Sequence, residues 1–444
     1  MQYAWVHYPG AGLAVVALAF SSFAQETIPE YPPQPLRDLM VLALQGNPDL
    51  QAAEMEAGAM HALGDHHGNW DAPDIGVEFY QAPIASFPNP LRDQMEIDYS
   101  VQQSVPWPGK LTSLAEPMHL RGQALEMKTK TEAMALARAL GGAYAQWITA
   151  WGRLRINRDA GRDAQTLLAG ARTRYEAGEG IQAEVLQAEG ELAELEGEAV
   201  ELEAQAENAR GVLARLINLP SDSLSRRLGD TAMEWHPRPL PGGLDSLKKT
   251  ALERHPELES MRLSVDAEAA EIVSRKKAIW PDVMVRGMYK DRLETTRDDW
   301  SLMIGFKATW VPWNLTAWRA SVREAEAARR REEWKLASNR LAVTQAVEKS
   351  YTDVQSAWRR LNLLEKRRLP LAEQALRSSL TAFANGRANL SLALLSFREA
   401  RKVREEALLV KAEHLLALSD LAYAVGWDPY QVTADKNPGK EALP

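Results

Sequence analysis

Residues 299–310, DWSLMIGFKATW, alternate between an apolar series and a mixed series of side chains. Successive side chains of a β-strand point to opposite faces of its sheet, so the alternation places one apolar series on one face. That series is Trp300, Leu302, Ile304, Phe306, Ala308 and Trp310. The same alternation recurs in residues 75–79, 97–105 and 283–289. The sequence therefore predicts two pairs of strands, at 72–105 and 281–311.

Apolar positions in most of the remaining chain follow a helical period. In residues 181–216 they are spaced by alternating fours and threes, which is the heptad pattern of coiled-coil packing. Residues 393–424 repeat this seam with smaller side chains. The helix before the first seam is predicted to span about 60 residues, or roughly 90 Å at 1.5 Å per residue. Two long helical hairpins are therefore expected, at 108–217 and 314–426.

The two halves of the chain resemble each other. QGNPDL near residue 48 matches ERHPEL near residue 256, and RYEAGEG (174–180) matches AFANGRA (382–388). Pro48 and Pro256 are 208 positions apart, and so are Gly178 and Gly386. Matches in one order at one offset indicate a duplication. The turn-rich segment at 219–243 is the expected linker between the copies.

This pattern predicts the organisation of the whole chain. The first repeat is expected at 25–218 and the second at 244–427, each with a helix, a strand pair and a helical hairpin. The first helix of each repeat is expected to begin near Asn47-Pro48 or His255-Pro256. Residues 428–444 form a C-terminal tail. The apolar run GAGLAVVALAF (10–20) is followed by small residues at Ser22 and Ala24, which indicates a signal peptide at 1–24. Past this run the sequence holds no apolar stretch long enough for a transmembrane helix.

Composition narrows the function. The net charge of -8 and the pI near 5.7 argue against a nucleic-acid-binding protein, since such proteins are usually basic. The chain has no cysteine, which excludes disulfides, thiolate metal sites and a lipidated N-terminal cysteine. We find no nucleophile–base set, phosphate loop or paired catalytic carboxylates, so an enzyme is not expected and no cofactor is predicted.

Four strands are too few to close a barrel, because even small closed barrels need about eight. An open sheet in lipid would leave its edge hydrogen bonds unmade. Three chains could pool about 12 strands, a number within the range of outer-membrane barrels. The apolar series Trp300, Leu302, Ile304, Phe306 and Trp310 would then face lipid. The alternative is a soluble periplasmic coiled-coil scaffold without transport activity, whose small sheets pack on helices.

The duplicated halves, the Pro-bounded strand pairs, the RYEAG reversal and the LINLP end of the returning helix resemble the TolC-type outer-membrane factor (outer membrane efflux protein) family. The segment SVPWPGKL (104–111) is similar to that of members associated with heavy-metal efflux. The resemblance implies a homotrimer with a 12-strand β-barrel in the outer membrane and an α-helical tunnel in the periplasm. It also implies a passive exit duct, which docks to a periplasmic adaptor and an inner-membrane pump, with heavy-metal cations as one expected cargo.

The resemblance also implies two kinds of functional residue. The helical reversals would form the periplasmic tips that dock the adaptor, with Tyr175 and Gly178 in the first and Phe383 and Gly386 in the second. Both glycines are expected to adopt a positive φ. In some relatives an acidic ring lies six and nine places after the second reversal glycine. These places are Leu392 and Leu395 here, and Glu184 and Gln187 in the first half, which favours an apolar constriction or ordinary packing.

The segment HALGDHH (61–67) is the only candidate for a metal site, since imidazole suits copper and zinc. Its candidate ligands are His61, Asp65 and His66. The corresponding segment of the second half, AEIVSRKK (270–277), has no such ligands, and a polar helix end explains the cluster equally. We therefore predict no metal site. His414 lies on the second seam, where a buried histidine of the core is expected.

Overall fold

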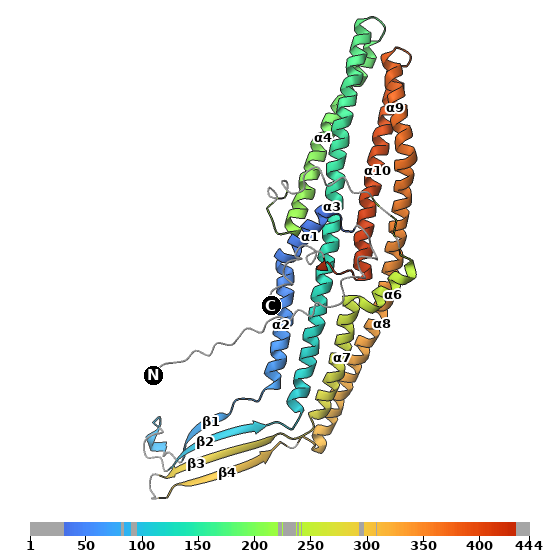
Figure 1. Ribbon diagram of the computed structural model, residues 1–444. Coiled ribbons are helices and arrows are strands. Elements are labelled where there is room, and N and C mark those ends of the chain that lie inside the picture. The colour runs from blue at the N-terminus through green and yellow to red at the C-terminus, as the bar shows by residue number, and fades with distance from the viewer. Residues whose placement is uncertain are drawn as a thin grey trace, which may run out of the picture. The chain divides into compact units, whose positions relative to one another are not determined.

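The computed structural model describes residues 31–80, 84–89, 96–220, 224, 237, 239–240, 242–292, 297–307 and 309–431 (Figure 1). The predicted signal peptide lies outside these residues, as do most of the predicted linker and residues 432–444 of the tail. The described part of the chain is mostly helical and has four strands. The predicted mostly α fold with two strand pairs is therefore confirmed, whereas the boundaries of the repeats stay a prediction.

The same order of elements occurs twice along the chain (Figure 1). The first half contains α1 (Gln34–Gly46), α2 (Pro48–Gly68), β1 (Asp74–Tyr80), the short 3-10 helix η1 (Ile84–Ser86), β2 (Glu96–Val105), α3 (Lys110–Glu176) and α4 (Gln182–Leu216). The second half contains α6 (Leu244–Arg254), α7 (Pro256–Lys277), β3 (Val283–Arg292), β4 (Asp299–Phe306), α8 (Pro312–Leu363), the π-helical turn η3 (Leu364–Arg368), α9 (Leu369–Ala384) and α10 (Leu390–Val425). The long helix after the strands is continuous in the first half and interrupted by η3 in the second.

The helices that lead into the strands begin at Xaa-Pro pairs. The Asn47 side chain accepts hydrogen bonds from the backbone N–H groups of Asp49 (2.9 Å) and Leu50 (3.2 Å), and Pro48 follows it. His255 accepts one from Glu257 N (3.3 Å), and Pro256 follows. Proline suits the first helical position because the N–H that it lacks has no partner inside the helix. The sequence predicted both helix starts, and the structure confirms them.

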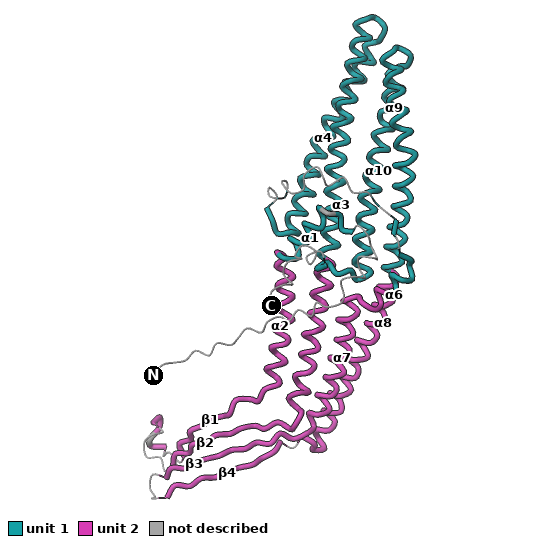
Figure 2. The backbone as a smooth tube through the Cα atoms, in the orientation of Figure 1, with its two compact units in different colours: residues 1–45, 136–249, 346–444 teal, residues 46–135, 250–345 magenta. Residues whose placement is uncertain are grey.

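The chain divides into two compact units (Figure 2). Unit 1 contains residues 1–45, 136–249 and 346–444, and unit 2 contains residues 46–135 and 250–345. Both halves of the sequence contribute to each unit. None of the helices in the described part of the chain is long and apolar enough to cross a membrane.

Unit 2 contains the sheet, an antiparallel one with the strand order β1-β2-β3-β4 (Figure 1). The last strand is shorter than its alternation suggested, since β4 ends at Phe306 and Trp310 lies beyond it. The reason is the partner strand: Phe306 pairs with Val283, the first residue of β3, and Lys307 N then bonds to Asp282 O (3.2 Å). Alternation of side chains alone does not extend a strand past its neighbour.

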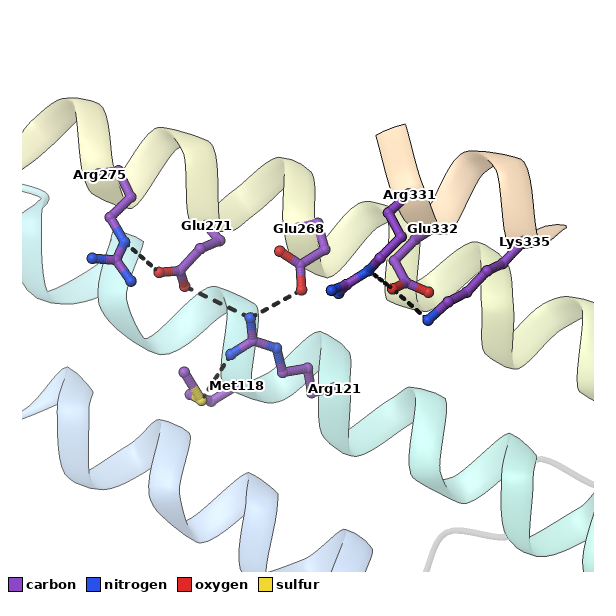
Figure 3. A network of polar contacts seen from close by, with 8 residues as sticks. All are labelled: Met118, Arg121, Glu268, Glu271, Arg275, Arg331, Glu332 and Lys335. Atoms are coloured by element: carbon purple, nitrogen blue, oxygen red, sulfur yellow. Dashed lines mark hydrogen bonds and ion pairs between the residues drawn. The ribbon is translucent and has the colours of Figure 1, made fainter. Parts of the chain in front are cut away.

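Polar contacts join helices from the two halves inside unit 2 (Figure 3). Arg121 of α3 lies 3.3 Å from Glu268 and 3.9 Å from Glu271 of α7. On α8, Arg331 and Lys335 both donate to Glu332, each at 2.9 Å. Partial burial raises the pKa of Glu332, but these two hydrogen bonds outweigh it and leave the pKa below its ordinary value. Glu332 therefore stays ionised on the helix surface.

Unit 1 has a core between four helices. Its buried side chains come from α3, α4, α9 and α10, and they include Leu167, Leu195, Leu376 and Phe397. Nine of the ten seam positions predicted on α10 are buried, from Ala393 to Ala424. His414 is one of them, and burial lowers its pKa to about 4, so the imidazole is neutral. The predicted helix-on-helix seam of the second hairpin is confirmed.

We expect Phe397→Ala to lower the free energy of unfolding of the helical region by about 3–5 kcal/mol, because it leaves a cavity among four helices. Phe397 is 1% exposed. Leu409→Ala is the matched control, since Leu409 lies on the same helix and is exposed. Thermal unfolding followed by far-UV circular dichroism measures the difference. Equal midpoints for the two variants would contradict the assignment of the core.

Candidate functional site

The register of the sheet gives its two faces different chemistry. Residues directly opposite in antiparallel strands share a face. Val77, Tyr99, Tyr289 and Trp300 form one row, and Ile75, Val101, Gly287 and Leu302 form the next. Val285 pairs with Ile304, and Val105 and Phe306 both pair with Val283 on the same face. This face is therefore mainly apolar across all four strands, and its polar members are Gln103 opposite Val285 and Asp291 opposite Ile97.

The apolar face is uncovered in the single chain. Trp300 is 78% exposed, Ile304 67% and Phe306 66%, and Leu302 is exposed beside them. Large apolar side chains gathered on an open surface mark a contact with another protein or with a membrane. The four predicted lipid-facing residues of β4 thus share one exposed face. Trp310 is exposed as well, but it lies outside the strand.

The opposite face carries the charges. Lys290 Nζ lies 2.7 Å from Glu96 and 3.1 Å from Asp98, and Arg292 lies 2.9 Å from Asp299. Asp98 is buried beneath these contacts. An apolar face backed by a polar, ion-paired face is the pattern of a sheet with lipid on one side and water on the other.

Each junction between a helix and a strand carries an exposed tryptophan. These are Trp70 before β1, Trp107 after β2, Trp280 before β3 and Trp310 after β4. Trp107 and Trp280 stack with ring centroids 5.2 Å apart. Trp107 is eight positions after Tyr99 and two positions past the end of β2, and eight steps of extended chain span about 26 Å, or about 20 Å at a tilt of 35–45°. Two aromatic levels at this spacing resemble the girdles that border a bilayer.

Each outer strand of the described sheet has one edge without a partner strand. Within the described residues, β1 pairs with β2 alone and β4 pairs with β3 alone. An edge strand presents a row of free backbone N–H and C=O groups, which readily pair with another chain. The sheet of one chain is therefore incomplete at two edges as well as on one face.

The two helical reversals of unit 1 have the same type of backbone conformation. Gly178 has φ 76° and Gly386 has φ 68°, so the predicted positive φ is confirmed at both glycines. Glu179 N bonds to Arg174 O (2.9 Å), and Arg387 N bonds to Ala382 O (2.8 Å), which is the equivalent bond 208 residues later. Glycine suits these positions because it has no Cβ to clash in this conformation.

Arg174 joins the two reversals. Its guanidinium lies over the Phe383 ring at 5.0 Å, and it donates to Ala388 O (3.3 Å) and to Glu179 O (3.4 Å). Phe383 is only 2% exposed, whereas Tyr175 is 48% exposed. Of the predicted docking residues, Tyr175 therefore lies on the surface of its tip, and Phe383 lies in the core below and supports it. The sequence did not identify Arg174, because its partners Phe383 and Ala388 are more than 200 residues away.

Three of the four gate candidates are exposed in the single chain, and the fourth is half-buried. Leu392 and Leu395 are exposed near the start of α10, and Gln187 is exposed on α4. Glu184 is half-buried, and its carboxylate accepts a hydrogen bond from Leu390 N (3.4 Å) at the first residue of α10. A gating role for these four residues stays a prediction. Glu184 has a structural role besides, since it ties α4 to α10.

Two glutamates of α4 bond to side chains of other helices. Glu191 is 5% exposed and accepts two hydrogen bonds from Arg398 of α10, at 2.9 and 2.5 Å. Glu198 pairs with Arg401 at 2.7 Å and accepts a hydrogen bond from Asn157 at 3.1 Å. A buried carboxylate needs such partners because desolvation otherwise disfavours its charge.

The weak metal candidates do not converge on one point. His61 lies 3.1 Å from Glu126 and stacks on His119 with ring centroids 5.9 Å apart. Asp65 pairs with His119 at 3.7 Å, whereas the His66 ring lies against His67 instead. Across the described residues, no group of three histidines or carboxylates is arranged to hold a metal ion. The cluster joins α2 to α3, through a histidine partner that the sequence analysis missed.

Comparison with known proteins identifies related chains. A family model described as outer membrane efflux protein matches residues 39–219 and 247–428. The fold is similar to that of the CmeC outer membrane channel from Campylobacter jejuni, with a TM-score of 0.73 and 12% identity over 95% of this chain and 94% of that chain. It is also similar to VceC from Vibrio cholerae, with a TM-score of 0.68 and 15% identity over 88% of this chain and 96% of that chain.

A third similar structure is the outer-membrane channel OprN, with a TM-score of 0.68 and 20% identity over 88% of this chain and 90% of that chain. At these identities the structural likeness shows the fold. No curated protein matches the chain. The family match therefore rests on the sequence model, which covers most of the chain.

We expect Gly178→Val together with Gly386→Val to strain both reversals by about 1–2 kcal/mol each, because a β-branched residue is disfavoured at positive φ. A Cβ at either glycine has no neighbour within 4 Å, so the effect comes from the backbone. Gly197→Val is the control, since Gly197 lies inside α4 with equally open space. Hydrogen exchange at residues 174–182 and 382–390 should accelerate in the double variant. Unchanged exchange there would contradict the strained-reversal assignment.

Proposed function

This chain belongs to the outer membrane efflux protein family, and we propose that it forms, as a homotrimer, the outer-membrane duct of a tripartite efflux system. Members of the family are passive channels and not enzymes. The chain is a protein of the outer membrane that extends into the periplasm. In the proposed assembly the duct receives its cargo from an inner-membrane pump through a periplasmic adaptor.

The exposed apolar sheet face with its two unpaired edges carries this proposal. Pairing β1 of one copy with β4 of the next satisfies both edges, and three copies supply 12 strands. The apolar face then meets lipid, and the ion-paired face of Lys290 and Arg292 lines the lumen. The tryptophans at the helix–strand junctions fit the boundary between lipid and water.

The alternative, a soluble periplasmic scaffold, leaves this surface without a partner. In the observed fold the helices of the same chain do not cover it, since Trp300 and Ile304 are exposed. A water-exposed apolar face of this extent, with open edges, would promote aggregation. The family match and the sheet both favour the channel.

Heavy-metal cations as cargo remain a proposal from the resemblance of residues 104–111. In the structure this segment supports the junction between sheet and helix: Trp107 stacks on Trp280, and Lys110 Nζ lies 2.7 Å from Asp282. Trp107 and Lys110 therefore have a structural role that is independent of the cargo. Metal tolerance of a strain that lacks this protein, with and without the gene restored, tests the cargo directly.

We expect Ile304→Arg and Leu302→Arg to impair membrane assembly, at a cost of about 2–4 kcal/mol for an arginine near the bilayer midplane. Met303→Arg is the matched control, because Met303 lies between them on the polar face. The measurement is the amount of heat-sensitive trimer in the outer-membrane fraction, together with channel conductance in planar bilayers. Equal yields for the three variants would reject the assignment of the lipid face. Absence of trimer and of conductance in the unchanged protein would reject the proposed function.

The proposed topology places residues 82–93 and 292–298 at the extracellular end, because each links two strands whose other ends join helices. Parts of both segments lie outside the described residues. We expect a short epitope inserted after Asn89 to bind antibody on intact cells. The same epitope after Gly180, in a helical tip, should be reached only after lysis. Labelling of intact cells at Gly180 instead would reverse the topology.

A further inference from the structure

The two reversals have the same backbone design but carry charges of opposite sign. The first reversal exposes the carboxylates of Glu176 and Glu179. The second exposes the guanidinium of Arg387. No carboxylate occurs anywhere from residue 374 to residue 398. The duplication therefore kept the turn and changed the charge on it.

Other charged groups near the reversals are engaged within the chain. Arg172 pairs with Glu189 at 2.6 Å, Glu184 accepts from Leu390 N, and Arg174 holds the backbone of both reversals. In the part of the chain that the structure describes, Glu176, Glu179 and Arg387 have no side-chain hydrogen bond or ion pair. Glu176, Glu179 and Arg387 are thus exposed charges without a side-chain partner, whereas the charged groups beside them are engaged in contacts within the chain.

Arg174 of the first reversal contacts the second reversal directly. It fixes the two reversals beside each other through contacts to Phe383 and Ala388. Glu176 and Glu179 nevertheless do not pair with Arg387. These three exposed charges therefore remain available to a partner. Complementary charges at an interface steer association and suppress wrong partners.

Each reversal also offers apolar surface close to its charge. Tyr175 and Ile181 are exposed in the first, and Leu392 is exposed shortly after the second. An apolar contact with a charged rim is the usual composition of a protein interface. The occupant that fits is a protein and not a small ligand, since the charges lie on convex turns.

We propose that the two tips are distinct docking points: the tip at Tyr175–Gly180 binds a cationic patch of the periplasmic adaptor, and the tip at Phe383–Ala388 binds an anionic patch of the same protein. This rests on the proposed function, which supplies the adaptor. Three copies then present six tips of alternating charge. An adaptor ring with six similar subunits meets two kinds of site, and the charges set its rotational register.

The test uses the full-length protein in its native cells, with a photo-crosslinking p-benzoylphenylalanine in place of Tyr175 or of Asn385. Each reporter is combined with Glu176→Lys plus Glu179→Lys, or with Arg387→Glu. The matched controls change the same charge on the helix shafts: Glu196→Lys plus Glu201→Lys on exposed positions of α4, and Arg162→Glu on α3. Crosslinked bands are identified by mass, and trimer level and bilayer conductance are measured on the same variants.

We expect crosslinks from both reporters to one adaptor protein. The lysine variant should reduce the yield from Tyr175 about three- to tenfold and spare Asn385, and the Arg387→Glu variant should do the reverse. The shaft controls should change neither yield. Normal trimer and conductance with crosslinks that ignore the tip charges would overturn the inference and leave the channel function standing. Crosslinks that join two copies of this chain would overturn it too, since the tip charges would then hold the ring together. Loss of trimer and conductance in the unchanged protein would instead reject the proposed function.

Discussion

The free backbone groups at the two edges of a four-stranded sheet, together with its uncovered apolar face, constrain every other part of this protein. Inside a bilayer, an unmade backbone hydrogen bond costs several kcal/mol, so a sheet must close on itself. Four strands cannot do so. In the proposed assembly, other copies of the chain supply the missing strands. The charge pairs on the other face, such as Lys290 with Glu96, are then the natural lining of a water-filled interior.

The long helices are held together by contacts with one another. Apolar seams provide most of the contact, as on α10, where small residues allow close approach. Ion pairs add cross-links where a carboxylate is buried, as between Glu191 and Arg398. Contacts between α3 and α7 join the two halves of the sequence through Arg121 (Figure 3). Folding of either half is thus tied to the other.

The two halves of the chain share the backbone conformation of their reversals, and they differ in the side chains on the reversal surface. The glycines at 178 and 386 keep the same φ and the same backbone bonds, because the turn cannot be made otherwise without strain. Side chains on the turn surface have no such constraint, and there the halves have diverged from carboxylates to an arginine. The uninterrupted α3 and the π-helical turn at Leu364–Arg368 show the same freedom within a helix.

The sequence by itself determined the elements and the faces of the sheet. Periods of two and of three and a half are local properties, so they predicted the strands and the α10 seam, and the proline pairs predicted the helix starts. Tertiary structure decided which residues meet. The pairing of Phe306 with Val283 ended β4 before Trp310. Packing of α2 against α3 paired His61 with Glu126 and Asp65 with His119. Arg174 reaches Phe383 and Glu191 reaches Arg398 across more than 200 residues, which no local period can reveal. Such contacts depend on how hairpins pack side by side, and that geometry exists only once the chain has folded.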